Sequence, residues 1–515
     1  MRFFNTAGPC VAEDHFMLPA SARLPGVRKL IDRKGYFVLH APRQSGKTTT
    51  VLELARELTA SGSYAAVVVS AEVGAPFPDD PGMAERAILG DWRASTAFQL
   101  PESFQPPPWP EAENGSRIGA ALSSWSRAIQ RPLVLFIDEV DALRGPALIS
   151  VLRQLRSGFP RRPDAFPWSL ALVGLRDVRD YKAASGGTES LHTSSPFNIK
   201  VESLTLSSFT AEEVARLYAQ HTAETGQLFT PEALARAFHL TQGQPWLVNA
   251  LARQVVEVVV PDSAVPVTAR HVDEAKEILI KRQDTHLDSL AERLREPRVR
   301  RVIEPILAGT SITDVPEDDR RFVLDLGLAR REAEGGFVIA NPIYREVIPR
   351  VLAQGSHDSL PAIHPSWLTP QGVLDPGKLL DAFLAFWRRH GQPLLASAPY
   401  HEIAPHLVLI AFLHRVVNGG GTLEREYAIG SGRMDLCLRY GDVVLGTELK
   451  VWRDGEKDPL AEGLEQLDGY LSGLCLPGGW LVIFDRRGGV APISERTSAT
   501  VVASPGGRAI TVIRG

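Results

Sequence analysis

The eight-residue loop Ala41-Pro-Arg-Gln-Ser-Gly-Lys-Thr48 constrains the fold of this chain more than any other feature. It follows the apolar run Tyr36–His40 and opens a helical pattern, which is the context of a phosphate-binding P-loop. Backbone N–H groups of such a loop and the N-terminus of the next helix cradle phosphate groups. Lys47 would neutralise the β and γ phosphates, and Thr48 would ligate Mg²⁺. The sequence therefore predicts an ATP site at Arg43, Gln44, Ser45, Gly46, Lys47, Thr48 and Thr49.

A second motif supports the first, because a Gly-Lys-Thr triplet alone is a weak signal and the loop begins with Ala41 instead of the usual glycine. The apolar run that begins at Leu133 ends in Asp138-Glu139. In this position Asp138 would hold the metal through water, and Glu139 would polarise the attacking water. The alternative is a pair of solvated acids after a strand. Two adjacent acids suit hydrolysis better than binding alone.

Apolar runs at 36–40, 65–70, 132–138 and 168–174 alternate with helical patterns between Tyr36 and about Thr205. This pattern predicts an α/β domain with a parallel sheet buried on both faces. At 515 residues the chain is long enough for two to four domains. The stretch from Ala71 to about Gly115 contains eight prolines and predicts a long loop. Helical periodicity follows, with Ser208 or Thr210 as a cap, and then helices and a hairpin near 334–337 in the order of a winged helix. The expected domains are 1–208 (P-loop core), 209–283 (helical lid), 284–353 (winged-helix-like), 354–374 (linker) and 375–515 (an α+β unit).

Composition excludes several classes of protein. Three cysteines without a C-x-x-C pair indicate neither a disulfide framework nor a cysteine zinc site. A net charge of −4 gives no global attraction to nucleic acid, so such binding would need local basic patches. The longest apolar run, Leu407–Leu413, is too short to span a bilayer, and the N-terminus has no signal-peptide pattern. We therefore expect a cytoplasmic protein with no membrane partner.

The P-loop and the acidic pair resemble those of the STAND-like branch of AAA+ ATPases, whose members couple nucleotide state to an attached effector. The run Leu172-Val-Gly-Leu-Arg176 is similar to the family's sensor strand, which implies that Arg176 lies near the γ-phosphate. The segment Thr241–Trp246 is similar to the Gly-x-Pro motif, which implies nucleotide contacts from Gly243 and Pro245. The segment Phe4–Pro9 resembles the stretch that wraps adenine. A surface arginine at 176 and a simple turn at Gly243 remain alternatives.

The C-terminal unit carries carboxylates with a definite spacing. Asp435 precedes a turn at Tyr440-Gly-Asp442, and the next run contains Glu448-Leu-Lys450. On a strand, Glu448 and Lys450 project from one face, where an adjacent strand can deliver Asp435. Carboxylate oxygens suit the one or two Mg²⁺ ions that phosphodiester hydrolysis uses, and Lys450 would orient the nucleophile and offset negative charge. The alternative is a surface salt bridge between Glu448 and Lys450.

This D…E-x-K pattern resembles the PD-(D/E)xK nuclease superfamily. Gln466 and Tyr470, at i and i+4 on the following helix, match the Gln-x-x-x-Tyr of its RecB-like branch. Glu402 lies where the superfamily often has another acid. The resemblance implies Asp435 and Glu448 as metal ligands, with Lys450, Gln466 and Tyr470 in the catalytic site.

Basic residues between the two sites add a third feature. Arg293, Arg295, Arg298, Arg300 and Arg301 concentrate charge in a helical stretch where duplex phosphates could bind. A solvated helix face is the favoured interpretation. Arg161 and Arg162 could serve subunit contacts, and Trp246, Trp387 and Trp480 are expected in the core.

Together these patterns predict an ATP-controlled, Mg²⁺-dependent DNA endonuclease that assembles into a homo-oligomer. By architectural analogy, proteins built this way are typically bacterial and are often associated with defence against foreign DNA. One alternative is a signalling or scaffolding ATPase whose nuclease-fold domain only binds nucleic acid. Another is a DNA translocase that uses this domain as a clamp.

Overall fold

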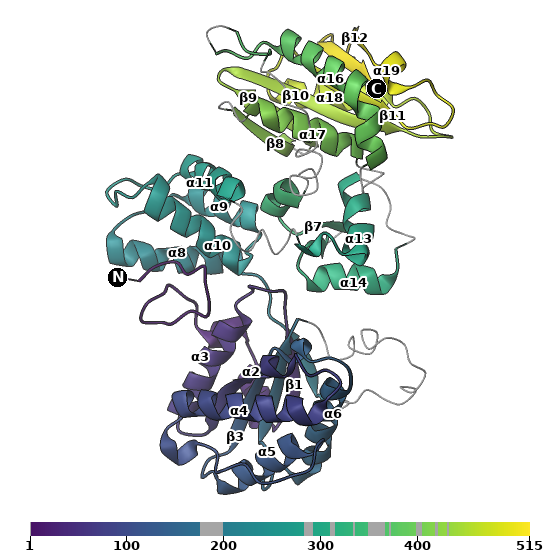
Figure 1. The fold of residues 1–515 in the computed structure, drawn as a ribbon. Helices are drawn as coiled ribbons and strands as arrows, with labels where there is room; N and C mark the ends of the chain where they lie inside the picture. The colour runs from purple at the N-terminus through teal and green to yellow at the C-terminus, as the bar shows by residue number, and fades with distance from the viewer. Residues whose placement is uncertain are drawn as a thin grey trace. The chain divides into compact units, whose positions relative to one another are not determined.

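The computed structural model describes residues 2–175, 199–282, 292–308, 315–332, 335–348, 366–369, 372–397, 404–417, 421–429 and 432–515. The chain divides into two compact units (Figure 1). The first comprises Met1–Arg282 and Arg321–Arg330, and the second comprises Gln283–Arg320 and Arg331–Gly515. Arg176 and Glu402, which the sequence nominates for the two sites, lie outside the described residues.

A five-stranded parallel sheet is the centre of the first unit. Its order is β2-β3-β4-β1-β5, and every neighbouring pair is parallel. The strands are β1 (Tyr36–His40), β2 (Ala65–Ser70), β3 (Leu133–Asp138), β4 (Ser169–Gly174) and β5 (Glu202–Thr205). The first four confirm the apolar runs predicted as strands. Because all strands run the same way, the P-loop after β1 and the acidic pair after β3 lie at the same edge of the sheet.

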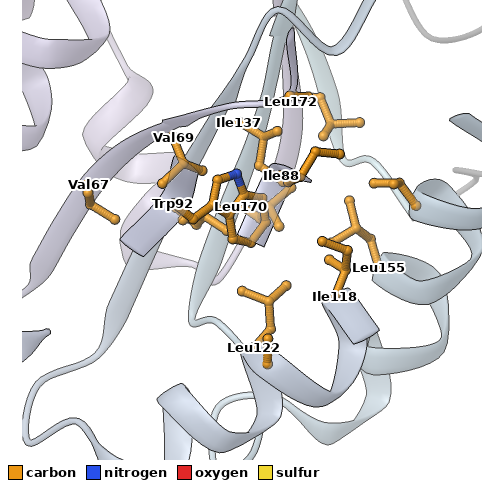
Figure 2. Packing of buried hydrophobic residues seen from close by; sticks show 14 of the residues in the cluster. Val67, Val69, Ile88, Trp92, Ile118, Leu122, Ile137, Leu155, Leu170 and Leu172 are labelled. Atoms are coloured by element: carbon orange, nitrogen blue, oxygen red, sulfur yellow. The ribbon is translucent and has the colours of Figure 1, made fainter. Parts of the chain in front are cut away.

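Both faces of this sheet are buried, which explains its unbroken apolar strands. On one face the strands pack against α4 (Pro81–Gln99), α5 (Arg117–Ala128) and α6 (Gly145–Gly158). Trp92, Leu122 and Leu155 of these helices belong to the same buried cluster as Leu170 of β4 (Figure 2). On the other face they pack against α1 (Ala20–Arg23), α2 (Val27–Asp32) and α3 (Lys47–Ala60). Successive residues of one strand therefore enter different cores. Short 3₁₀ turns span Glu72–Gly74, Glu102–Phe104, Val140–Ala142 and Phe159–Arg161.

The prediction of a long loop from Ala71 to Gly115 is wrong for its middle part, which forms α4. Asp80 caps this helix by accepting from the Met83 N–H at 3.0 Å, and Pro81 occupies its first turn, where a missing N–H costs nothing. Trp92 is buried against the sheet. Seven of the eight prolines lie outside the helix. The prediction failed because it used the proline content of the whole stretch, whereas the prolines lie mainly on either side of the helical segment.

Four helices follow the sheet, in the segment that the sequence predicts to be helical. They are α8 (Ala211–Thr225), α9 (Pro231–Thr241), α10 (Pro245–Gln254), which continues as a π-helical turn at Val255–Val259, and α11 (Ala269–Arg282). Thr210 caps α8 in a capping box: its hydroxyl accepts from the Glu213 N–H at 3.1 Å, and the Glu213 carboxylate accepts from the Thr210 N–H at 2.8 Å. The capping residue is thus Thr210 rather than Ser208.

After the lid, the described elements follow the predicted order of helices and then a hairpin. They are α13 (Pro297–Ala308), α14 (Glu317–Asp325), β6 (Ala329–Arg331) and β7 (Phe337–Ile339), with a further helical segment at 342–348. The strands β6 and β7 form a two-stranded sheet. The assignment of these elements as a winged helix stays a prediction.

The C-terminal part is a mixed six-stranded sheet of order β12-β13-β11-β10-β9-β8. Strands β10, β11 and β13 are mutually parallel, and the other neighbours are antiparallel. Its helices are α16 (Pro376–Ser397), α17 (Ala404–Val417), α18 (Leu460–Gly473) and α19 (Ile493–Arg496). Its strands are β8 (Gly421–Ile429), β9 (Gly432–Tyr440), β10 (Val443–Trp452), β11 (Gly478–Asp485), β12 (Ser498–Ala503) and β13 (Ala509–Arg514).

Helices cover both faces of this sheet. Leu467 and Leu471 of α18 pack with Ile483 of β11 on one face. The neighbouring residue on that strand, Phe484, contacts the Trp387 ring of α16 on the other face, with ring centroids 5.0 Å apart. Trp367, inside the stretch predicted as a linker, is buried and lies 5.8 Å from the Phe412 ring of α17.

Candidate nucleotide and carboxylate sites

The P-loop connects the end of β1 to the start of α3, and its backbone adopts the conformation that the motif requires. Gln44 and Gly46 have positive φ angles of 58° and 84°, and Gly46 forms the N-cap of α3. Ala41 is fully buried and is not among the residues with positive φ. An alanine therefore fits the first position without backbone strain. Ser45 is buried, and its hydroxyl donates to the Pro42 carbonyl at 2.8 Å.

The Lys47 ammonium lies among oxygen atoms of the loop. It donates to the carbonyls of Ala41 and Pro42, both at 2.8 Å. Burial lowers the pKa of Lys47, while the carboxylates of Asp138, Asp141 and Glu139 act in the opposite direction. Phosphate oxygens would offer this cation stronger acceptors than two neutral carbonyls.

Thr48 and Asp138 meet although they are far apart in the sequence. The Thr48 hydroxyl donates to Asp138 Oδ2 at 2.7 Å, and Asp138 Oδ1 accepts from the Glu139 N–H at 2.9 Å. The two side chains thus bring hard oxygen donors to one point beside the P-loop. This donor set fits Mg²⁺, which takes one or two protein oxygens and completes its shell with water and phosphate.

Glu139 follows β3 in an unusual backbone conformation, with φ of 54°. Burial raises the pKa of its carboxyl, and Asp138 and Asp141 raise it further. Asp141, which the sequence analysis did not single out, accepts from the Leu175 N–H at 3.2 Å and so ties the end of β4 to the turn after β3. The repeated acids in Asp138-Glu-Val-Asp141 were the available signal. Arg176 directly follows Leu175 but is outside the described residues.

Gly243 holds the lid in a conformation that another residue could not adopt. Its φ is 73°, its carbonyl accepts from the Phe209 N–H at 2.8 Å, and an added Cβ would lie 1.8 Å from the Phe209 carbonyl oxygen. Gln244 caps α10 through the Leu247 N–H and donates to the Gln44 carbonyl of the P-loop at 3.3 Å. Pro245 is buried in the first turn of α10. The predicted Gly-x-Pro segment therefore does reach the P-loop.

The N-terminal segment contacts both the lid and the P-loop helix. The Thr6 carbonyl accepts from Trp246 Nε1 at 2.8 Å, and the Thr6 hydroxyl accepts from Arg253 at 3.0 Å. The Cys10 N–H donates to the hydroxyl of Thr49 on α3 at 3.0 Å. Phe4–Pro9 thus lies next to the nucleotide site. Arg43 and Gln44 are exposed at the same loop.

The carboxylate site forms across the β9–β10 hairpin. Thr447 pairs with Leu436 in the antiparallel register, so Asp435 and Glu448 are the next residues along their strands. Asp435 Oδ2 accepts from the Leu449 N–H at 2.8 Å. Glu448 is buried, and Lys450 Nζ lies 3.3 Å from its Oε1. The hairpin therefore brings together the three residues that the pattern predicts.

Helix α18, which packs against β10, contributes further side chains to the site. Gln466 Oε1 accepts from Lys450 Nζ at 2.5 Å. Glu462 Oε1 lies 3.3 Å from the same ammonium and accepts from Gln466 Nε2 at 3.1 Å. Glu462 was missed in the sequence, although its i−4 spacing from Gln466 was a signal. Tyr470 is half-buried against the core under α18, one turn beyond Gln466.

Among the described residues, one oxygen of Glu448 has no hydrogen-bond partner. This oxygen, Oε2, is buried. Burial raises the pKa of Glu448 to about 8, Asp435 adds to the shift, and Lys450 opposes it. Although burial lowers the pKa of Lys450, Glu448 and Glu462 raise it above its ordinary value. A buried carboxylate oxygen of this kind beside a second carboxylate fits a divalent cation, which would neutralise both.

Within the described ranges, no three His, Cys, Asp or Glu residues cluster as a metal site. Two carboxylates would therefore leave most of the coordination shell to water and substrate, as Mg²⁺ prefers. The structure also describes no helix that is long and apolar enough to cross a membrane.

The arginines of α13 and its N-terminal flank are largely engaged with acids. Arg298 and Arg301 both pair with Asp319, at 3.4 and 2.9 Å, and Arg293 pairs with Glu296 at 2.6 Å. These contacts favour the interpretation of a helix face with internal ion pairs. Arg162 stacks on Phe159, with its guanidinium carbon 3.4 Å from the ring centroid.

Comparisons with protein families and curated proteins found no match. Among solved structures, the chain is similar to a Walker-type ATPase of Pyrococcus abyssi, at 13% identity and a TM-score of 0.48, over 67% of this chain and 99% of that one. It is also similar to the Thermotoga maritima RuvB Holliday junction branch migration motor, at 17% identity and a TM-score of 0.35, over 64% and 92% of the two chains. The Aeropyrum pernix ORC1 protein in complex with DNA gives 15% identity and a TM-score of 0.35, over 66% and 94%.

Because these identities and TM-scores are low, the class of the fold rests on the strand order and loops of this chain. Five parallel strands, with a P-loop after β1 and an acidic pair after β3, form a P-loop NTPase fold. A mixed six-stranded sheet forms its C-terminal part.

Proposed function

We propose that this chain is an ATP-binding and ATP-hydrolysing AAA-like protein that controls a Mg²⁺-dependent DNA endonuclease. The observation that carries the nuclease half is the buried carboxylate of Glu448, which lies beside Asp435 on the hairpin. Its Oε1 contacts Lys450, and its Oε2 has no hydrogen-bond partner among the described residues. A structural salt bridge would explain the Lys450 contact but not the second carboxylate or the orphaned oxygen.

In the ATPase half, Lys47 would bind the β and γ phosphates, and Glu139 would orient and deprotonate the attacking water. Its raised pKa brings it closer to the value at which a carboxylate accepts a proton efficiently. Thr48 and Asp138 would hold Mg²⁺. Held there, the metal would supply positive charge that offsets the charge of the phosphates.

In the nuclease half, Asp435 and Glu448 would hold Mg²⁺, which supplies a Lewis acid at the phosphodiester. Lys450 would orient the attacking water and stabilise negative charge on the phosphate. Gln466 and Glu462 hold the ammonium in place through their contacts with Nζ. Tyr470 is assigned to the site from its spacing alone.

The partner is proposed to be DNA, because two carboxylates with a lysine suit a phosphodiester, and because AAA-like control of such a domain is known from defence against foreign DNA. A homo-oligomer is expected, since in related ATPases a neighbour often supplies an arginine to the γ-phosphate. Both proposals rest on the resemblance and the site chemistry.

The test is cleavage of plasmid and linear DNA with Mg²⁺ by the full chain, with and without ATP. Lys450→Ala and Glu448→Ala should each reduce the rate by about 100-fold or more. Glu465→Gln removes an exposed carboxylate from the same helix, next to Gln466, and should cleave like the wild type. ATP turnover without cleavage in any nucleotide state would leave the signalling or scaffolding ATPase as the better explanation.

A further inference from the structure

A second cluster of side chains lies at the carboxyl ends of β10, β11 and β13. Trp452 ends β10 and pairs in register with Asp485, which ends β11. Because residues two apart on a strand share a face, Trp452 lies on the same face as Glu448 and Lys450. At about 3.3 Å per residue, its backbone is about 7 Å beyond Lys450 and about 13 Å beyond Glu448. Bound nucleic acid could therefore reach both places.

The guanidinium of Arg487 lies over the indole ring of Trp452. Its guanidinium carbon is 3.4 Å from the centroid of the indole, whose own Nε1 donates to the Glu456 carbonyl at 3.1 Å. Asp485 holds the edge of the guanidinium through two bonds, from Nε at 3.0 Å and from Nη2 at 2.8 Å. The indole of Trp452 and the carboxylate of Asp485 therefore restrict the orientation of the Arg487 guanidinium.

Part of the Arg487 side chain remains open to solvent. The Arg487 side chain is 33% exposed although one of its faces is covered by the indole. Planar guanidinium groups stack on nucleobases, and a preorganised one loses little entropy on binding. This geometry is that of a stacking surface already formed before a ligand arrives.

Charge argues for a base rather than a phosphate as the ligand. Arg487 is paired with Asp485, and the neighbouring Arg514, whose guanidinium carbon lies 5.5 Å from the Trp452 ring centroid, is paired with Asp458 at 2.7 Å. These acids offset the attraction that the arginines would exert on a phosphate. Stacking of a base on the face of the guanidinium does not require an unpaired positive charge.

We propose that Arg487, held by Trp452 and Asp485, is a stacking platform for an unpaired nucleobase, and that the carboxylate site acts on single-stranded DNA or on a single-stranded part of a DNA substrate. The inference rests on the proposed nuclease function. A base in a duplex is already stacked on both faces, so only an unpaired base gains from this platform. The distance from Glu448 corresponds to roughly four nucleotides of a stacked strand, or fewer of an extended one.

The test measures binding of a fluorescein-labelled DNA strand of about 20 nucleotides to the full chain by anisotropy, with EDTA to prevent cleavage. Arg487→Lys keeps the charge but loses the planar group, so it should weaken binding of the single strand by about tenfold and leave binding of the duplex unchanged. Arg508→Gln is the matched control, because Arg508 pairs with Asp468 and its guanidinium bonds to the Leu476 carbonyl near the start of β11. It should bind like the wild type.

Salt dependence separates stacking from a phosphate contact. Removing a stacked arginine should leave the slope of log affinity against log salt concentration unchanged, whereas removing a phosphate contact lowers it by about one. Arg487→Gln is suited to this comparison. A changed slope, equal losses for single strand and duplex, or no loss at all would each overturn the platform.

A measurement on the wild-type chain tests the proposal even if a variant fails to fold. Photocrosslinking of a strand that carries 5-iododeoxyuridine should label the peptides around Trp452 or Arg487, and labelling only elsewhere would overturn the proposal. The two proposals also fail separately. If the chain binds single strands through Arg487 but never cleaves DNA, the nuclease proposal fails and the stacking proposal stands. If the chain cleaves DNA and Arg487→Lys does not alter cleavage, the stacking proposal fails and the nuclease proposal stands.

Discussion

Glu448 has a carboxyl whose charge state depends on the fold. Its pKa in the folded chain is about 8, whereas an unfolded glutamate has a pKa of about 4.3. Between these values the folded chain binds more protons at this position than the unfolded chain does. Without metal, the contribution of Glu448 to stability therefore falls as pH rises through this window, at no more than about 1.4 kcal/mol per pH unit.

Glu448→Gln should remove this pH dependence. In EDTA, the variant should gain stability relative to the wild type between about pH 5 and 8, because a neutral amide carries no penalty for burial of charge. Hydrogen exchange of β9 and β10 peptides, compared between the two proteins at each pH, measures the difference locally. A constant difference across this range would contradict the raised pKa.

Glu139→Gln tests the other acidic residue at the same scale. The amide keeps the shape but cannot accept a proton from water, so ATP turnover should fall by about 10² to 10⁴-fold while ATP binding is retained. Phosphate release and nucleotide binding are the two measurements. Glu72→Gln is a suitable control, since Glu72 affects the pKa of Glu139 less than Asp138, Asp141 or Lys47 does. Loss of binding together with turnover would assign Glu139 a structural role.

At the scale of elements, Gly243 determines how the chain enters α10 and packs against Phe209. Gly243→Ala would place a Cβ 1.8 Å from the Phe209 carbonyl oxygen, so the Phe209–Gly243 hydrogen bond and the entry to α10 must shift. The cost should exceed the 1 kcal/mol or so that a left-handed alanine alone incurs. ATP affinity should fall with it, because Gln244 and Pro245 would move away from the P-loop.

Gly226→Ala provides the matched control in the same lid. Gly226 ends α8 with φ of 79°, but nothing lies within 4 Å of an added Cβ. This variant should lose about 1 kcal/mol and keep ATP affinity. Thermal unfolding and nucleotide titration compare the two. Equal effects from both substitutions would show that the close approach to Phe209 does not matter.

At the scale of the whole molecule, the proposal requires that nucleotide state changes DNA cleavage. Lys47→Ala should bind no ATP, while Glu139→Gln should bind ATP and not release it. With ATP present the two variants should therefore cleave DNA at different rates, and without ATP at the same rate. The direction of the difference identifies the active state. Identical rates under both conditions would mean that the ATPase does not control the carboxylate site.

Buried strands of the first sheet were predictable almost to the residue. Tyr36–His40 and Ala65–Ser70 are apolar throughout because helices cover both faces of each strand. The weakly buried β5 had no such pattern and was not predicted. α4 was missed because its signal is amphipathic and lies among prolines. Local pattern predicts an element well when burial dominates its composition and poorly when turn residues surround it.

The hairpin of the carboxylate site was also predictable, since a two-residue turn after Tyr440 sets the register that places Asp435 beside Glu448. The approach of Gln466 and Glu462 to Lys450 was not a local property, and neither was the stacking of Arg487 on Trp452. Both depend on packing and pairing between segments: Leu467 and Leu471 seat α18 on the sheet, and parallel pairing of β10 with β11 aligns Trp452 with Asp485.

The sequence by itself therefore determined the P-loop, the acidic pair after β3 and the strands that carry both sites, because short-range geometry and burial specify these features. Only the tertiary structure decided that the Thr48 hydroxyl bonds directly to Asp138, that Gln244 reaches the P-loop, and that Glu448 has one buried oxygen without a hydrogen-bond partner among the described residues. These contacts join residues many positions apart. Their distances follow from how whole elements pack, which no local pattern records.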